Sequence, residues 1–388
     1  MQITRITSHV LQYDLPEKLG YSQQYYSRRT AHLVRIDTDE GIVGWGECFG
    51  PGTIAIANKG IVEGVIQPLV LGQDPLDRDV IWHKCYNLMR DHAQKGMPLQ
   101  ALSGIDIALW DIAGKVAGLP IHKLIGGSHR SDVSAYGYGM MLRPEQPREL
   151  ASRFKDEANA LKEMGFTAIK MKVGIGSKND ISLVEAVRDA IGNDLALMVD
   201  ANHCYTTSEA FQVGHALEDL DVYWFEEPVA PEDLRGYREL RKGLKVNIAG
   251  GEAEYSRWGW LNLLESRGLD IAQPEVCALG GITEYLRVLA LCHAYFTPVI
   301  NHVWGSAVAL AANLQLLASI PPLPGGLYPW QPMLEFDTTD NRFIEDLPKI
   351  PFGIKEQVKE NGGRVRIPTE PGLGIEPDRD FIEEYEIS

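Results

Sequence analysis

The sequence predicts an α/β fold: a closed barrel of parallel strands preceded by a smaller α+β domain. From residue 131 to residue 338, segments of strand type alternate with amphipathic helical segments, which fits eight strand–helix units of a parallel barrel. Residues 1–130 instead combine a hairpin pattern with helical patterns, which indicates an α+β domain. A doubly wound open sheet is the alternative fold for the repeating part, but Gly174-Ile175-Gly176 lacks the third glycine of a dinucleotide-binding motif.

Composition and charge narrow the class of protein. The 388 residues are 45% hydrophobic and 23% charged, which is ordinary for a globular chain. Because the net charge is −16 and no basic stripe stands out, we expect no nucleic-acid partner. The N-terminus lacks the apolar core of a signal peptide and no apolar run is long enough to span a bilayer, so we expect a cytoplasmic enzyme without a membrane partner. Five scattered cysteines without a Cys-x-x-Cys pair disfavour a disulfide framework and a structural zinc site.

The first 130 residues contain, in order, a strand, a loop, a hairpin and helices. Residues 2–13 alternate in hydrophobicity like a strand, and residues 30–50 form a hairpin pattern around Asp39, Glu40 and Gly41. The polar and aromatic segment 16–30 between them is expected to be a mobile loop. Amphipathic helices are then expected at 57–71, 77–92 and 100–118.

The repeating part shows its unit most clearly around residues 179–200. Asn179 and Asp180 are candidate helix caps, apolar residues recur on one side of the helix that follows, and Gly192 ends it before a buried strand. Strands of this kind are expected near 133–139, 167–172, 195–200, 221–226, 245–252, 269–275, 297–302 and 332–336.

A polar residue ends seven of these strands in succession. Since the carboxyl ends of all the strands of a parallel barrel meet at one mouth, where active sites lie, residues far apart in the sequence are expected to converge there. The seven residues, each 23 to 33 positions after the last, are Lys172, Asp200, Glu226, Glu252, Glu275, His302 and Glu335.

Three successive strands end in carboxylates, Asp200, Glu226 and Glu252. Three carboxylates held close together repel one another and do not all ionise unless a cation lies between them. Oxygen ligands favour a hard divalent ion such as Mg²⁺, and no histidine or cysteine joins the three to favour zinc. We therefore expect one Mg²⁺ site, with Glu227 beside it as a supporting residue; three separate helix caps or rim salt bridges are the alternative.

Candidate acid–base residues surround this expected metal site. Lys170 and Lys172 lie two positions apart on one strand, hence on the same face, and mutual repulsion is expected to lower the pKa of one of them enough for a general base. His302 lies across the mouth, with Glu275 on the preceding strand placed to hydrogen-bond the imidazole. Glu335 is expected to offer a hydrogen bond on the side opposite the metal. Two bases facing each other across a cation suit removal of a proton from a carbon beside a carboxylate.

These residues and motifs resemble the enolase superfamily, mandelate racemase subgroup, over essentially the whole chain. The resemblance rests on ALSGIDIALWD, KMK, VDAN, WFEEP, GGE, QPE and NHVWG; GWGECFGP, MRDHAQKG, MLEFD and PGLGIEPDRD are most similar to galactarolactone cycloisomerases within the subgroup. The resemblance implies a modified TIM barrel of eight parallel strands and seven helices at 131–338, an α+β capping domain at 1–130, and a C-terminal tail at 339–388 that returns to the capping domain.

The resemblance also implies roles for the residues above. Asp200, Glu226 and Glu252 are the implied ligands of one Mg²⁺ per subunit. Lys172 is implied as the base on one face with Lys170 in support, His302 as the acid or base on the other, and Glu335 as the electrophilic partner. One departure is Glu275, because the subgroup pairs its histidine with an aspartate. The expected substrate contacts are Asn202, His203, Tyr25, Arg28, Arg29 and Trp304, with the two arginines either clamping a distal carboxylate or merely solvated.

The family implies an acid sugar or its lactone as the small-molecule substrate, and an even-numbered homo-oligomer, from dimer to octamer. In a cycloisomerase, Lys172 or His302 removes the α-proton and a ring oxygen leaves the β-carbon, which suits a lactone or a 3,6-anhydro sugar acid. The same residues serve an acid-sugar dehydratase when a hydroxyl leaves, and a racemase when nothing leaves. A non-catalytic binding barrel is a remote alternative, because it would not need the charged mouth.

Overall fold

The computed structural model describes residues 1–387 and begins with an antiparallel sheet in the order β1-β2-β3. The strands are β1 Ile3–Tyr21, β2 Gln24–Thr38 and β3 Val43–Cys48. The predicted hairpin at 30–50 is present, but the predicted mobile loop at 16–30 is wrong. The β1–β2 ladder bulges after Asp14, resumes at Leu19 opposite Tyr26, and continues to Tyr21 opposite Gln24. Leu19 of this segment packs against Tyr138 and Met141 of the barrel, and the pairing continues to the turn, so the segment is a long hairpin with a tight tip.

Helices cover one face of this sheet. They are α1 Thr53–Ile61, the π-helical turn η1 Val62–Ile66, α2 Gln67–Val70, α3 Arg78–Met89, α4 Met97–Ala117 and α5 Ile121–Leu124. Helix α4 is buried along most of its length and lies directly on β3. The contact needs glycine, because a Cβ built on Gly46 would lie 1.9 Å from the carbonyl oxygen of Gly104.

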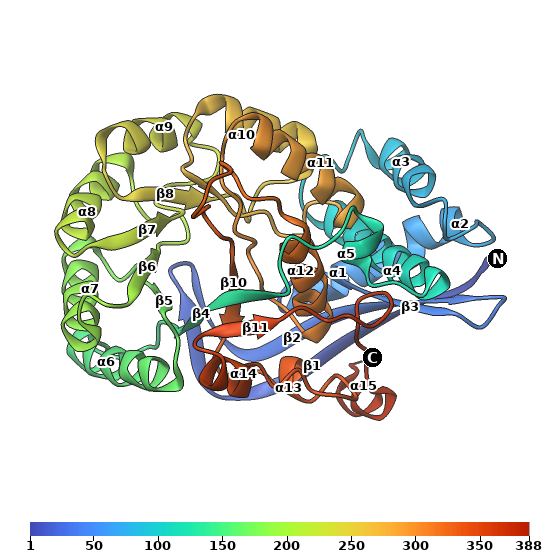
Figure 1. Ribbon diagram of the computed structural model, residues 1–388, viewed down its shortest axis with the longest axis horizontal. Helices are drawn as coiled ribbons and strands as arrows, with labels where there is room; N and C mark the ends of the chain where they lie inside the picture. The colour runs from blue at the N-terminus through green and yellow to red at the C-terminus, as the bar shows by residue number, and fades with distance from the viewer. Residues whose placement is uncertain (388) are drawn as a thin grey trace.

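The barrel begins with β4 at Asp132 (Figure 1). Its strands pair in parallel in the order β10-β4-β5-β6-β7-β8-β9. They are β4 Asp132–Met140, β5 Ala168–Lys172, β6 Ala196–Asp200, β7 Val222–Glu226, β8 Asn247–Gly250, β9 Ile271–Ala272 and β10 Met333–Asp337. The expected strand at 297–302 makes a single bridge, from Val299 to Ala272. One of the eight expected strands is therefore an extended segment with almost no strand pairing.

Within residues 1–387, seven helices surround these strands, which agrees with the modified barrel. They are α6 Pro147–Met164, α7 Ser177–Ile191, α8 Thr207–Asp219, α9 Leu234–Gly243, α10 Ser256–Ser266, α11 Gly281–Ala294 and α12 Ala307–Ser319. The apolar side of each lies against the strands, as Leu183, Val184 and Val187 of α7 do.

The C-terminal part runs back over the N-terminal sheet, as Figure 1 shows in red beside blue. Its elements are α13 Arg342–Glu345, α14 Ile354–Glu360, β11 Arg364–Arg366 and α15 Arg379–Tyr385. Strand β11 pairs antiparallel with β4, and the amide of Ile387 donates to the carbonyl of Val10 at 2.8 Å. The division of the chain at residues 130 and 338 stays a prediction. Within residues 1–387, no helix has the length and apolar character needed to cross a membrane.

Candidate active site

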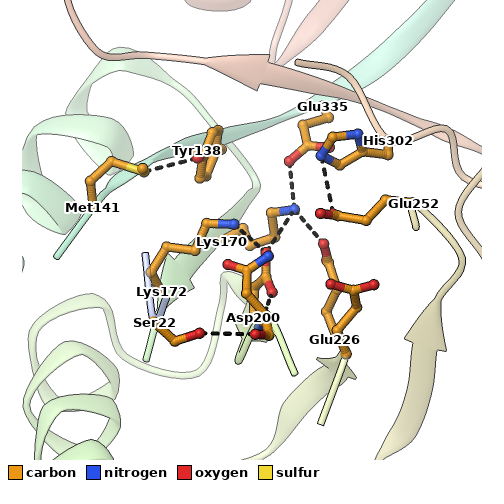
Figure 2. Close-up of polar contacts among 12 residues, drawn as sticks. Ser22, Tyr138, Met141, Lys170, Lys172, Asp200, Glu226, Glu252, His302 and Glu335 are labelled. Atoms are coloured by element: carbon orange, nitrogen blue, oxygen red, sulfur yellow. Dashed lines mark hydrogen bonds and ion pairs between the residues drawn. The ribbon is translucent and has the colours of Figure 1, made fainter. Parts of the chain in front are cut away.

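The register of the barrel strands brings the predicted residues to one edge. Lys172 pairs with Asp200 across β5 and β6, and Asp200 pairs with Glu226 across β6 and β7. Glu252 follows the end of β8 by two residues. Figure 2 shows these side chains pointing toward one another, with His302 and Glu335 completing the cluster. The seven-residue series predicted from spacing therefore gathers polar groups into one enclosed site.

The three carboxylates form a cluster suited to a divalent cation. Asp200, Glu226 and Glu252 each place an oxygen within 4.8 Å of the others. Burial, with repulsion from Asp200, raises the pKa of Glu226 to about 7, and burial raises the pKa of Glu252 to about 8. Glu252 Oε2 is buried and faces His302 Nε2 at 3.1 Å. All-oxygen donors and raised pKa values together fit Mg²⁺.

Two side chains that were not predicted from the sequence donate hydrogen bonds to one oxygen of Glu226, Oε2. Trp224 Nε1 donates to Glu226 Oε2 at 2.9 Å, and Gln273 Nε2 donates to the same atom at 2.8 Å. Both lie two positions before a predicted site residue, so their side chains share its face of the strand, and this spacing was the available signal. These contacts leave Glu226 Oε1 free of them, and it accepts from Lys170 Nζ at 2.8 Å.

Lys170 is fully enclosed among carboxylates. Its Nζ lies 2.5 Å from Glu335 Oε1, 2.8 Å from Glu226 Oε1 and 3.7 Å from Asp200 Oδ2. Burial alone would favour the neutral amine, but Glu226 and Glu335 raise the pKa of Lys170 well above its ordinary value. Lys170 is therefore a fixed positive charge at the centre of the site.

Lys172 contacts Asp200, and its ammonium lies 5.1 Å from the centre of the Tyr138 ring. The expectation that mutual repulsion lowers the pKa of one lysine is wrong for this structure. Burial and Lys170 do lower the pKa of Lys172, but Asp200 raises it above its ordinary value. Repulsion between the two lysines is outweighed by the carboxylate of Asp200, which ends the next strand and pairs with Lys172.

His302 lies between two carboxylates. Its Nδ1 is 2.7 Å from Glu275 Oε2, so the contact predicted for Glu275 is present despite the longer side chain. Its Nε2 is 3.1 Å from Glu252 Oε2. Burial favours the neutral ring, but Glu252 and Glu275 outweigh it and raise the pKa of His302 to about 10. The imidazole is therefore protonated at neutral pH in this structure and is placed to act as an acid.

Glu335 contacts both Lys170 and the segment that carries His302. Its Oε1 contacts Lys170, and its Oε2 accepts a hydrogen bond from the amide of Val303 at 3.0 Å. Burial would raise the pKa of Glu335, but Lys170 lowers it below the ordinary value. The ionised carboxylate accepts hydrogen bonds, so the expected role as a hydrogen-bond donor requires a proton that this geometry disfavours.

The expected substrate contacts Asn202 and His203 follow the end of β6, beside the carboxylate triad. Asn202 and His203 both have left-handed backbone conformations, with φ of 40° and 55°. The Oδ1 of Asn202 is buried and receives no hydrogen bond from residues 1–387, whereas His203 Nδ1 is 3.2 Å from Glu227 Oε2. The tip of the β1–β2 hairpin covers this corner, because Ser22 Oγ donates to the Asn202 carbonyl at 2.9 Å (Figure 2). Ser22 was not predicted.

The remaining expected contacts lie farther along the hairpin. Tyr25 is 46% exposed and donates to the carbonyl of Arg143 at 3.3 Å. The Arg28 side chain is 61% exposed and pairs with Asp14. Neither position brings a free polar group to the enclosed cluster, so the structure lends no support to a substrate role for either residue.

Arg29 and Trp304 form a buried structural contact. The Arg29 guanidinium is 2.6 Å from Asp337 Oδ2, donates to Thr339, and lies 4.9 Å from the centre of the Trp304 ring. Arg29 Nη1 and Nη2 are engaged by Asp337 and Thr339, which disfavours a clamp on a distal carboxylate, although the buried Nε receives no partner from the described residues. Trp304 lies two residues after His302, and its ring meets the ring of Tyr138 with 6.1 Å between centroids.

The chain belongs to the mandelate racemase/muconate lactonizing enzyme family of the enolase superfamily and is an enzyme of that superfamily. Residues 5–126 match the family described as mandelate racemase/muconate lactonizing enzyme, N-terminal domain, and residues 153–381 match enolase C-terminal domain-like. Members of this superfamily use Mg²⁺.

The similar proteins act on acid sugars. A D-galactarolactone cycloisomerase of Agrobacterium fabrum is 40% identical over 388 residues, 99% of each chain. An arabinonate dehydratase of Saccharolobus solfataricus is 33% identical over 91% of this chain and 89% of the relative. The crystal structure of the 3,6-anhydro-D-galactonate cycloisomerase from Zobellia galactanivorans superposes with a TM-score of 0.85, at 33% identity and full coverage of both chains.

Proposed function

We propose that this protein is a Mg²⁺-dependent cycloisomerase that opens an acid-sugar lactone or an anhydro sugar acid to a 2-keto-3-deoxy sugar acid. The observation that carries the proposal is the placement of Lys172 beside Asp200 and of His302 beside Glu252, at the two ends of the carboxylate triad (Figure 2). The 40% identity to a D-galactarolactone cycloisomerase supports the substrate class.

Asp200, Glu226 and Glu252 would hold one Mg²⁺ per subunit. When bound, the ion supplies a Lewis acid for the negative charge that develops on the substrate carboxylate during loss of the α-proton. Once the charge of Asp200 is shared with a cation, burial and the neighbouring Lys170 ammonium favour the neutral amine of Lys172, as a base requires.

Lys172 and His302 then divide the proton transfers. Lys172 takes the α-proton, and the electron pair of that C–H bond first passes to the substrate carboxylate, which gives an enediolate. In a second step that pair forms the double bond to the β-carbon as the bond from the β-carbon to the ring oxygen breaks. His302 gives its proton to the departing oxygen, and the contact of its Nδ1 with Glu275 Oε2 supports the protonated ring once the charge of Glu252 is shared with the cation. The enol that results tautomerises to the 2-keto acid.

The fixed charge of Lys170 carries part of the rate enhancement. A positioned base contributes about 10²–10⁴ in rate, whereas enzymes lower barriers by about 8–23 kcal/mol in total. A unit charge pair at 4 Å is worth about 4 kcal/mol at an effective dielectric near 20. Preorganised charges at the cation site and at Lys170 are therefore needed in addition to the base.

Acid-sugar dehydration is the second candidate. The 33% identity to an arabinonate dehydratase favours it, and the same residues serve when a β-hydroxyl leaves with the proton from His302.

We also expect a cytoplasmic homo-oligomer of two to eight copies, to be measured by light scattering on the purified protein.

The test is a screen of aldonates, aldarates, their lactones and 3,6-anhydro sugar acids with Mg²⁺ present, with detection of keto acid. Product from a lactone or an anhydro acid supports the cycloisomerase. Product from linear acids alone identifies a dehydratase. If no compound gives product and none exchanges its α-proton in deuterated water, the proposed function is rejected.

A further inference from the structure

The end of β3 reaches from the N-terminal sheet into the barrel next to His302. Glu47, on β3, is only 2% exposed. Its Oε1 accepts from the amide of Ser306 at 3.0 Å, and its Oε2 accepts from Ser306 Oγ at 2.6 Å and from the amide of Ala309 at 2.9 Å. One carboxylate thus binds the start of α12 and the end of the segment that carries His302.

The chain around Gly305 is shaped to admit this carboxylate. Gly305 has a φ of +145°, and a Cβ built on it would lie 2.5 Å from Glu47 Oε1. Asn341 Nδ2 donates to the carbonyl of Gly305 at 3.2 Å. Gly305 and Ser306 are therefore held from two sides, by Asn341 and by Glu47 of the N-terminal sheet.

The residue that follows β3, Phe49, contacts His302 directly and Glu275 through the backbone of Cys277. The ring of Phe49 meets the ring of His302 edge to face, with 6.0 Å between centroids. The amide of Phe49 donates to the carbonyl of Cys277 at 2.9 Å, and the amide of Cys277 donates to Glu275 Oε1, also at 2.9 Å. Contacts from residues 47–49 thus reach both His302 and Glu275.

The segment 297–302, which ends at His302, makes little backbone pairing with the neighbouring strands. Residues 297–302 make one bridge, at Val299, whereas Lys172, Asp200 and Glu226 lie in continuous parallel pairing. An imidazole on such a segment depends on side-chain contacts for its place.

We propose that Glu47 is a positioning residue that holds His302 where its imidazole reaches the substrate, so that the N-terminal sheet sets the geometry of one side of the chemistry. This inference rests on the proposed function, in which His302 supplies the proton for ring opening. Displacement of His302 slows that step and leaves the step of Lys172 in place.

The experiment compares Glu47→Gln with Asp106→Asn. Asp106 is a matched control, since it is also a buried carboxylate of the N-terminal part and accepts from the amide of Thr283 near the start of α11. For Glu47→Gln we expect kcat for keto-acid formation to fall by about 10²-fold, the order expected for a misplacement near 1 Å, with KM little changed. Exchange of the substrate α-proton in deuterated water is retained. Asp106→Asn loses thermal stability and keeps kcat.

Ser306→Ala provides a milder variant in case Glu47→Gln does not fold. It removes one donor to Glu47 and keeps both amides, so a smaller fall in kcat with unchanged KM is expected. Equal kcat losses in Glu47→Gln and Asp106→Asn, or wild-type kcat in both Glu47→Gln and Ser306→Ala, would overturn the proposal.

A spectroscopic measurement separates this inference from the proposed function. In the full-length protein labelled with ¹⁵N-histidine, the Nδ1 signal of His302 reports its contact with Glu275. We expect that signal to shift in Glu47→Gln and to stay in place in Asp106→Asn. If the wild-type protein turns over no acid sugar, the proposed function fails while the signal still tests Glu47; an unshifted signal rejects the positioning role.

Discussion

The two halves of the active site are held in place by different means. On the lysine side, Lys172, Asp200 and Glu226 end neighbouring strands that pair in continuous register. On the histidine side, His302 lies on a segment with a single bridge, placed by side chains from elsewhere in the chain. Backbone pairing sets positions that few side-chain substitutions disturb. The position of His302 instead depends on individual side-chain contacts, and several of these side chains come from outside the barrel.

The halves also differ in how charge is balanced. On the lysine side, Lys172 and Lys170 outweigh burial at Asp200, so its pKa lies below the ordinary range and it stays ionised, whereas Glu226 keeps a raised pKa. On the histidine side, Glu252 keeps a raised pKa and faces the imidazole. The following changes test this contrast, from the largest expected effect to the smallest.

Replacing Lys172 with methionine removes the base and keeps much of the side-chain volume. We expect α-proton exchange and keto-acid formation to fall together by about 10²–10⁴. Deuterium incorporation measured by NMR checks the exchange step, and Mg²⁺ titration checks that the carboxylates still bind. Exchange at the wild-type rate would assign the base to another residue.

Asp200→Asn removes one charge from the triad. We expect Mg²⁺ affinity to fall roughly a thousandfold, since loss of a charge pair near 4 Å costs about 4 kcal/mol and each 1.4 kcal/mol is tenfold. Isothermal titration calorimetry measures the affinity. Glu254→Gln, which alters a nearby carboxylate outside the triad, is the control, and equal effects of the two would remove Asp200 from the ligand set.

Trp224→Phe tests whether the lysine side also needs side-chain support. It removes the donor to Glu226 Oε2, so we expect Mg²⁺ affinity to fall by about 10–100-fold, as for other contacts that orient a metal ligand. Trp260→Phe is the matched control, because Trp260 is equally buried and its Nε1 donates to no described residue. Equal losses in both variants would indicate a packing effect.

Glu275→Gln tests the pair on the histidine side through the pH dependence of kcat. His302 acts as an acid only while protonated, so activity is present below its pKa and lost as the pH rises through it. Glu252 and Glu275 raise this pKa to about 10, and removal of Glu275 lowers it. We expect the alkaline limb of the rate profile to move to lower pH, by an amount of order one pH unit for each 1.4 kcal/mol lost. An unchanged pH dependence of kcat would show that Glu275 does not control the protonation of His302 during the reaction.

Much of the site could be predicted because strand ends recur at regular spacing. The count from Lys172 to Glu335 needed only the parallel-barrel rule that all carboxyl ends share a mouth. The hairpin at 16–30 was missed because its polar residues resemble a loop, and Leu19 gains meaning only against Tyr138 and Met141 of the barrel. Arg29 was assigned to substrate because its partner Asp337 lies more than 300 positions away.

Local periodicity by itself determined the alternation of strands and helices, and with it the set of residues that face the mouth, because hydrophobic spacing dictates which side of each element is buried. Only the tertiary structure decided their protonation and support. Those depend on charges and donors from distant parts of the chain, such as Asp200 against Lys172, Trp224 under Glu226 and Glu47 behind His302. Coulomb energy and hydrogen bonding act over a few ångströms of space, whatever the separation along the sequence.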